Sequence, residues 1–288
     1  MQLKLTQLIQ NTILSSSLYT NYPSKYIYSI YGNNLTIPCF ENKPFILSCF
    51  ALSTDGKLCY PDNPSGFAIA AANDAATNLE RYADWWCLSL ARSISDGVII
   101  GSNSLLIENG EYIAKINIPE LIQFRTEIDK PSQLLHIIIC RDTEKIDWLK
   151  QAIIQDNNTP VVIYTLNITE TLPQTLVSTT SYNKNLLKQV IKLEQINLPK
   201  IIAELYSCGI KTILNESPYF HHQLLQHQLL DEAWLNTSGV HIGGNVASLG
   251  SNTQAFTSYN HPSLTILTMH HIGYNFLYTR YKVSYATN

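Results

Sequence analysis

Residues 92–106 read RSISDGVIIGSNSLL. An apolar run at 98–100 ends abruptly at Gly101, and three small polar residues follow it. A short run of branched apolar residues that stops at a glycine indicates a buried β-strand. Since ligands of open parallel sheets lie beyond the carboxyl ends of the strands, the polar residues after this strand form a candidate binding site.

The same strand-sized apolar form occurs at four other places in the chain, and stretches with helical patterning lie between them. This alternation predicts an α/β domain with a mostly parallel central sheet flanked by helices. Two C-terminal segments, 232–244 and 264–285, have no helix between them, so we expect antiparallel strands at one edge. The other predicted strands lie at 44–52, 134–140, 160–165 and 210–215, and the predicted helices at 73–90, 147–155, 197–208 and 218–230.

The first 42 residues precede the alternating pattern. They contain a helical pattern at 3–14 and a tyrosine-rich stretch at 18–32 that we interpret as a loop. We therefore expect an N-terminal extension at 1–42 and one domain at 43–288.

Composition limits the classes of partner. The 288 residues are 45% hydrophobic and 14% charged, with a formal net charge of −3, so no basic surface for nucleic acid is expected and a small molecule fits better. No apolar run reaches membrane-spanning length, and the six cysteines are scattered as in a reduced compartment, which predicts a cytoplasmic protein. The sparsely charged C-terminal strands would suit a homodimer interface.

The histidines do not form a recognisable metal motif. His221, His222 and His227 share one predicted helix, and no pair has the i, i+4 zinc spacing with a neighbouring glutamate. No G-x-S-x-G elbow and no Walker loop occurs. We therefore expect no metal site and no nucleophilic hydrolase.

Three polar loops follow predicted strands: STDGK after the strand at 44–52, GSNS after the one at 96–101, and NESP after the one at 210–215. Asp55 is the only carboxylate in the first loop, and Gly56 permits a tight bend. Each loop also has a purely structural interpretation. STDGK can be an Asp-Gly turn, and the other two loops can cap the helices that follow them, since Pro218 is favoured at a first helical position.

Taken in order, four segments resemble the reductase domain of bacterial riboflavin biosynthesis, which has a dihydrofolate-reductase-like fold. The segments are FALSTDGKL, SGFAIAAANDAATNL, ARSISDGVIIGSNSLL and ILNESPYFHHQLLQHQLLDEAWLNTSGVHIGG. The family pattern has Ser-x-Asp-Gly-Lys, an Asp at a helix start, Leu-Arg-x-x-Ala-Asp-x-x-x-Val-Gly-x-Gly-Thr, Glu-Gly-Gly-Pro, and Leu-x-Asp-Glu with a later Gly-Gly. The resemblance covers about residues 43–285.

The resemblance implies an NADPH-dependent reductase that transfers a hydride to the ribosyl group of a ribosylaminopyrimidine phosphate or a related small molecule. Asp55 would be the catalytic residue near the reacting sugar, and Arg92 would bind the substrate phosphate with its planar guanidinium. Further substrate-binding residues would be Ser53, Lys57 and Asp74. The implied NADPH-binding residues are Gly101, Ser102, Asn103, Ser104, Arg141, Asn215, Glu216 and Ser217.

Two loops depart from the family pattern. Asn103 replaces a glycine but tolerates a positive φ. Asn215, Glu216 and Ser217 stand where the family has Glu-Gly-Gly, so side chains replace glycines where a pyrophosphate would approach a helix start, and an inward Glu216 carboxylate would repel it. The altered loop favours an alternative, a non-catalytic relative that keeps the fold for ligand binding or assembly. A folate or pterin reductase is a further alternative.

Overall fold

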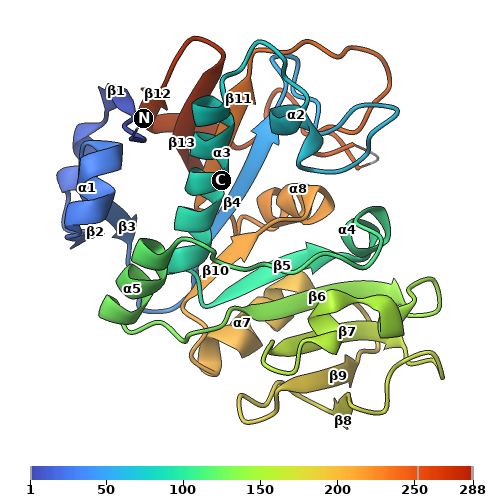
Figure 1. Ribbon diagram of the computed structural model, residues 1–288. Helices are drawn as coiled ribbons and strands as arrows, with labels where there is room; N and C mark the ends of the chain where they lie inside the picture. Colours follow the sequence, from blue (N-terminus) through green and yellow to red (C-terminus); the bar gives the residue numbers. More distant parts are fainter. Residues whose placement is uncertain (1, 252, 287–288) are drawn as a thin grey trace.

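The computed structural model describes residues 2–251 and 253–286. It contains an eleven-stranded mixed sheet and a separate hairpin of β2 and β3 (Figure 1). The order in the large sheet is β1-β12-β13-β11-β4-β10-β5-β6-β7-β9-β8. The strands are β1 (Thr6–Gln10), β2 (Tyr19–Tyr22), β3 (Leu35–Pro38), β4 (Phe45–Leu52), β5 (Gly97–Gly101), β6 (Leu135–Asp142), β7 (Val161–Asn167), β8 (Val177–Thr179), β9 (Lys188–Lys192), β10 (Thr212–Asn215), β11 (Glu232–Ser238), β12 (Ser263–His271) and β13 (Phe276–Ser284).

The helices lie between these strands. The α-helices are α1 (Lys25–Tyr31), α2 (Ala68–Ala71), α3 (Asn78–Ile94), α4 (Ser102–Ile107), α5 (Pro119–Glu127), α6 (Ala152–Gln155), α7 (Leu198–Ser207) and α8 (Pro218–Gln226), with short 3-10 helices η1 (Thr12–Ser15) and η2 (Trp148–Lys150). Among the described residues, no helix is both long and apolar enough to cross a bilayer.

The predicted fold class is confirmed. β4, β5, β6, β7 and β10 all form near their predicted positions and pair in parallel. β11 runs parallel to β4 on one side and antiparallel to β13 on the other, so the C-terminal strands are antiparallel as expected. The sequence alternation thus identified the centre of the sheet and its C-terminal edge.

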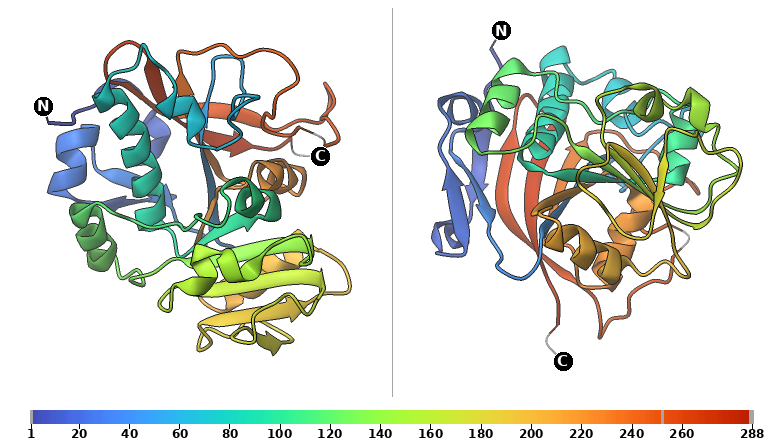
Figure 2. Two further views of the ribbon diagram at one scale, coloured as in Figure 1. Left: turned by 45° about the vertical axis from the view of Figure 1, so that its right-hand side comes forward. Right: turned by 90° about the horizontal axis from the view of Figure 1, so that it is seen from below.

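Helices cover both faces of the sheet, as the two views of Figure 2 show. One hydrophobic core contains Trp86 of α3 and Phe124 of α5, and the other contains Ile202 of α7 and Leu224 of α8. Val98 and Ile100 of β5 belong to the first core, and Ile99 belongs to the second. Because both faces of β5 are buried, its sequence is continuously apolar instead of alternating.

The N-terminal predictions were wrong in local structure. The stretch at 3–14, predicted as a helix, contains the edge strand β1, which pairs antiparallel with β12, and then the short η1. The expected loop at 18–32 contains β2 and α1. Hydrogen bonding to the distant β12 overrides the local helical pattern of β1.

The helix predicted at 73–90 begins later, at Asn78. Thr77 and Glu80 form a capping box, in which the Thr77 side chain accepts from the Glu80 amide and the Glu80 carboxylate accepts from the Thr77 amide. Such a pair satisfies two amides that would otherwise lack partners, so it sets the helix start. Asp74 therefore lies in the exposed turn before α3, not at the helix start.

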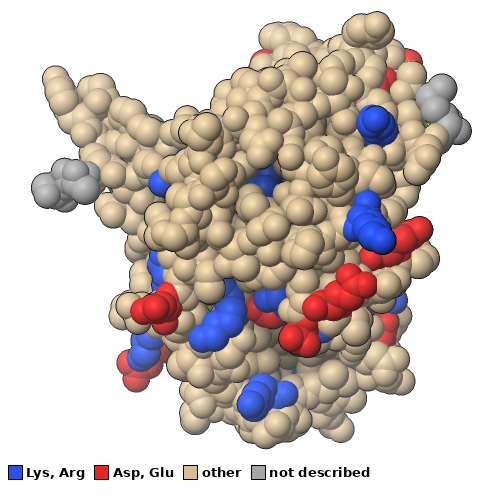
Figure 3. All heavy atoms as spheres, turned by 90° about the vertical axis from the view of Figure 1, so that its left-hand side faces the viewer, with Lys and Arg blue, Asp and Glu red and all other residues tan. Residues whose placement is uncertain are grey.

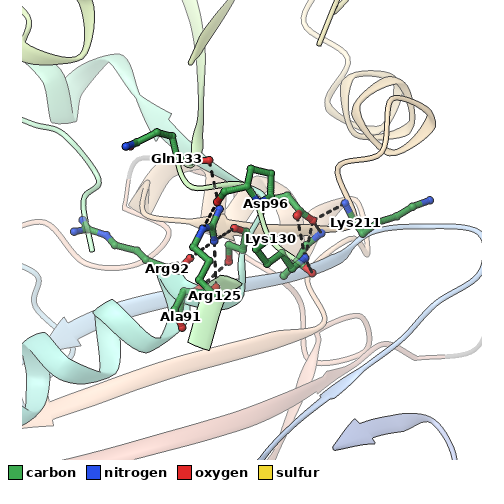
Figure 4. Close-up of polar contacts among 11 residues, drawn as sticks. Ala91, Arg92, Asp96, Arg125, Lys130, Gln133 and Lys211 are labelled. Carbon is green, nitrogen blue, oxygen red and sulfur yellow. Dashed lines mark hydrogen bonds and ion pairs between the residues drawn. The ribbon is translucent and has the colours of Figure 1, made fainter. Parts of the chain in front are cut away.

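The corner between α3 and β5 is fixed by a buried polar network (Figure 4). The Arg125 guanidinium donates to the carbonyl oxygens of Arg92, Ser93 and Ser95 at the end of α3. The Asp96 carboxylate accepts from Lys130 Nζ at 2.9 Å and from the Thr212 amide at 2.8 Å. This network holds the last turn of α3, which carries Arg92, against β5 and β10.

Candidate functional site

Two of the three predicted loops meet at one edge of the sheet, and the third follows a strand that ends further along the same edge. Because β4, β10 and β5 are neighbours and parallel, the residues that follow them share the same edge. The contact between the last two loops is close, since a Cβ added to Gly101 would lie 2.7 Å from Ser217 Oγ. The sheet order thus brings together segments that lie far apart in the sequence.

Asp55 ties the turn after β4 to the loop after β11. Its carboxylate accepts from Ser53 Oγ at 2.7 Å, from the Ile242 amide at 3.1 Å and from the Gly243 amide at 2.7 Å. The Ser53 hydroxyl, and then the Ile242 amide, hold the pKa of Asp55 well below its usual range. The Lys57 amide in turn donates to Ser53 Oγ at 2.8 Å. Asp55 is therefore an ionised, partly exposed carboxylate in a fixed position.

Arg92 is buried, with 1% of its surface exposed. Its Nε and one terminal nitrogen each lie 2.7 Å from an oxygen of Glu216, and its other terminal nitrogen donates to the Lys115 carbonyl at 3.1 Å. Tyr112 donates to the same carboxylate at 2.6 Å. A substrate phosphate could reach the guanidinium only by displacing Glu216.

The carboxylate of Glu216 does not face a dinucleotide. Its side chain is 8% exposed and points to Arg92. Burial raises the pKa of Glu216, but the charge of Arg92 and the hydrogen bonds from Arg92 and Tyr112 lower it overall. The carboxylate is therefore ionised, and the positive charge of Arg92 balances it. The expected repulsion between Glu216 and a pyrophosphate does not arise.

The exposed part of the edge suits a phosphate-bearing group. Ser102 and Ser104 are partly exposed, and Asn103 and Arg141 are exposed, at the ends of the adjacent strands β5 and β6. Hydroxyl and amide donors beside a guanidinium are a chemically appropriate set for phosphate oxygens. Asn103 lies in α4 and is not among the described residues with a positive φ.

Asn215 and Ser217 lie behind this exposed surface. Asn215 is fully buried and donates to Ser48 Oγ at 3.0 Å and to the Ser217 carbonyl at 3.0 Å. The Ser217 side chain accepts from the Phe220 amide and caps α8, which confirms the alternative of a capping loop before Pro218. These two residues shape the loop, while the accessible donors come from α4 and Arg141.

Sequence reasoning missed Asp84, a carboxyl on the sheet-facing side of α3. Asn236 of β11 donates to Asp84 Oδ1 at 2.7 Å, and Asn236 is paired with Ala51, next to the carboxyl end of β4. Burial raises the pKa of Asp84 to about 6. Its neighbours Ala83, Trp86 and Cys87 are buried. An acidic residue on the apolar side of a predicted helix was the sequence feature that could have identified Asp84.

The histidines do not gather around a cation. Within 2–251 and 253–286, no three His, Cys, Asp or Glu side chains are arranged to hold a metal ion. His221 is buried, and burial together with His222 lowers its pKa to about 4. It packs edge-on against Phe50, as a neutral core histidine does.

A family model described as the RibD C-terminal domain matches residues 44–276. A comparison with curated protein sequences finds no match. The fold, however, is found in several solved structures.

RibD of Acinetobacter baumannii is 17% identical, with a TM-score of 0.57, and the match covers 85% of this chain and 59% of that one. A pyrimidine reductase-like protein from Corynebacterium diphtheriae is 13% identical, with a TM-score of 0.58 and coverage of 84% and 93%. The diaminohydroxyphosphoribosylaminopyrimidine deaminase/5-amino-6-(5-phosphoribosylamino)uracil reductase of Thermotoga maritima is 13% identical, with a TM-score of 0.58 and coverage of 90% and 59%. The chain thus spans about three fifths of two of these proteins, and at these identities the likeness establishes the fold.

Proposed function

Because the chain belongs to the RibD C-terminal domain family, we propose that it is a reductase that transfers a hydride from NADPH to the ribosyl group of a ribosylaminopyrimidine phosphate or a related small molecule. The observation that carries this proposal is that the loops after β4, β10 and β5 share one edge of the sheet, where the loops after β10 and β5 touch. This edge combines a fixed carboxylate, exposed hydroxyl donors and a guanidinium. Such a set can orient two phosphorylated molecules beside each other.

On the cofactor side, NADPH would supply the hydride. Ser102, Asn103 and Ser104 would donate hydrogen bonds to its phosphates, and Arg141 would bind the phosphate that distinguishes NADPH from NADH. Asn215 and Ser217 would act indirectly, by holding the start of α8 and its contact with Gly101.

On the substrate side, we assign Asp55 to the neighbourhood of the reacting sugar, with Ser53 and Lys57 supporting its turn. Asp84 is a second carboxyl near the end of β4, and a pKa of about 6 allows it to hold or release a proton close to neutral pH. The guanidinium of Arg92 has little exposed surface because it is paired with Glu216. We therefore propose that Arg92 positions Glu216 and its loop and does not bind the substrate directly.

A cofactor titration tests this function. NADPH should raise the melting temperature of the purified protein, and NADH should do so less. Arg141→Ala should weaken NADPH binding about tenfold, which corresponds to the loss of one charge-assisted contact. Lys145→Ala, a change of another exposed cation in the next loop, is the matched control and should bind like the natural protein. A flat titration at millimolar NADPH contradicts the proposal.

A second candidate function is a non-catalytic relative that binds a ligand or a partner. The observation that favours it is that Asn215 and Ser217 are buried and Glu216 is engaged with Arg92, so no glycine loop is open to a pyrophosphate. The variant Glu216→Gly/Ser217→Gly with Arg92→Met restores glycines without leaving a buried charge. Binding of NADPH by this variant alone would support the second candidate. A third outcome, reduction of a folate or pterin, would identify a different substrate on the same fold.

A further inference from the structure

A separate cavity lies between the N-terminal segment and the C-terminal strands, on the side of the molecule where Figure 1 shows α1, β1 and β12. Its volume is about 190 Å³. The cavity is partly open to solvent, and its volume is several times the roughly 30 Å³ that one water molecule takes in the liquid. All its lining residues except Thr268 lie outside the segment 44–276 that the family model matches.

The base of the cavity is rigid. Thr268 of β12 and Arg280 of β13 are cross-strand partners, and both are buried. The Tyr31 hydroxyl lies 2.6 Å from Thr268 Oγ1. The Arg280 guanidinium donates to the Glu232 carboxylate at 2.9 Å and to the Thr36 carbonyl at 2.8 Å. These groups are held in place by the protein itself, as binding sites with low reorganisation cost require.

The lining combines polar and apolar surface, and its charge is paired. Gln10, Asn21, Asn33 and Asn34 supply carboxamides, each of which offers both donors and an acceptor. Among the described residues that line the cavity, Arg280 alone is charged, and Glu232 balances it. The surrounding face has few charged side chains in the upper half of Figure 3. Arg280 is thus already paired before a ligand binds, and a neutral ligand needs no counter-charge here.

The cavity offers hydroxyl and carboxamide groups, and the side chains of Leu14 and Tyr28 add apolar surface to it. The Tyr31 ring already packs against His270, with ring centroids 4.0 Å apart, and lies near Trp86 at 6.2 Å. Tyr31 therefore contributes its hydroxyl and not a free ring face for stacking. Asn21 and Thr36 are paired across the β2–β3 hairpin and both line the cavity. Alternating amides and hydroxyls complement a ligand that is itself rich in hydroxyl groups.

We propose that this cavity binds a neutral, hydroxyl-rich small molecule of monosaccharide size. Its volume is below the range of about 300–1,000 Å³ that is usual for drug-sized ligands, which excludes a dinucleotide. The site lies between the N-terminal segment and the strands β12 and β13, apart from the carboxyl edge of β4, β5 and β10. It is therefore independent of the proposed reductase function.

The test is ligand-observed NMR and calorimetry on the full chain with D-ribose and D-glucose as probes, and inorganic phosphate as the charged comparison. At least one sugar should bind with a millimolar or lower dissociation constant, and phosphate should not compete. Asn34→Trp should abolish sugar binding by filling the cavity. Asn157→Trp, which changes an exposed asparagine outside the lining, is the matched control and should bind unchanged.

If Asn34→Trp fails to fold, a milder variant, Asn21→Ala, still tests sugar binding. Asn21→Ala removes one carboxamide without adding volume and should weaken sugar binding about three- to tenfold, as expected for one lost hydrogen bond. The proposal is overturned if neither sugar binds, if phosphate displaces the sugar, or if binding to Asn21→Ala and a folded Asn34→Trp equals that of the natural protein.

Discussion

Arg92 and Glu216 form a bidentate ion pair inside the protein, with both guanidinium–carboxylate distances at 2.7 Å. The two residues are 124 positions apart and come from α3 and the loop after β10. Tyr112 completes the pair by donating to the same carboxylate. The pair joins the residue expected on the substrate side to one expected on the cofactor side.

Removing one partner of this pair should destabilise the fold strongly. Glu216→Ala leaves the guanidinium buried without a counter-charge, and the free energy of unfolding should fall by about 3–5 kcal/mol. The double variant Arg92→Met/Glu216→Leu should cost much less than the sum of Arg92→Met alone and Glu216→Leu alone, because it removes both charges together. Urea denaturation measures these values. Asp147→Ala, which breaks the exposed pair with Lys150, is the control and should change little. Additive single and double variants would contradict this account.

Gly101→Ala should strain the contact between the two loops. The new methyl would lie 2.7 Å from Ser217 Oγ, and overpacking of this kind costs about 1–3 kcal/mol. Adding Ser217→Gly should recover most of the loss, since glycine is a tolerable helix cap. Gly66→Ala has no neighbouring atom within 4 Å and serves as the control. Thermal unfolding distinguishes these variants, and equal melting temperatures for Gly101→Ala and Gly66→Ala would refute the close contact.

Asp84 should make stability depend on mildly acidic pH. The pKa of this carboxyl is raised from 3.8 to about 6 in the folded protein. Between about pH 4 and pH 6 the folded protein holds a proton that the unfolded chain has released, so stability falls as pH rises through this window and is level above it. Relative to Asp84→Asn, the natural protein should lose up to about 2 kcal/mol between these limits, allowing for its partial exposure. A difference between the two proteins that does not vary with pH would count against the raised pKa.

Asp55→Ala should loosen the loop after β11. The amides of Ile242 and Gly243 both donate to this carboxylate, so their hydrogen exchange should accelerate when the acceptor is removed. Asp62→Ala, which changes an exposed acid in a neighbouring loop, should leave that exchange unchanged. Mass spectrometry of exchanged peptides provides the measurement. Unchanged protection in the Asp55 variant would show that the loop is held by other contacts.

The centre of the sheet could be predicted because its strands are buried on both faces. The runs that form β5, β6 and β7 are continuously apolar, and this property is independent of which strands lie next to them. The three site loops followed from the strand ends, and the sheet order then placed them at one edge. Ser53, Asp55 and Gly101 lie there as the sequence pattern indicated.

Other features depend on partners that no local pattern reveals. β1 is an exposed edge strand whose hydrogen-bonding partner, β12, comes from the other end of the chain. In the sequence, Arg92 resembles a phosphate-binding cation, but in the fold its guanidinium is paired with Glu216. Asp84 becomes unusual only through burial beside Asn236. In each case the decisive interaction joins segments that are distant in sequence.

The position of β4 has a consequence for the nascent chain. β4 ends at Leu52, whereas its two sheet neighbours, β10 and β11, begin at Thr212 and Glu232. During synthesis this apolar strand therefore leaves the ribosome long before either neighbour exists. We expect this part of the sheet to close only after β10 and β11 have been made, with β4 shielded by a chaperone or by transient contacts until then. A strand that is made early is thus enclosed by two strands that are made about 160 to 180 residues later.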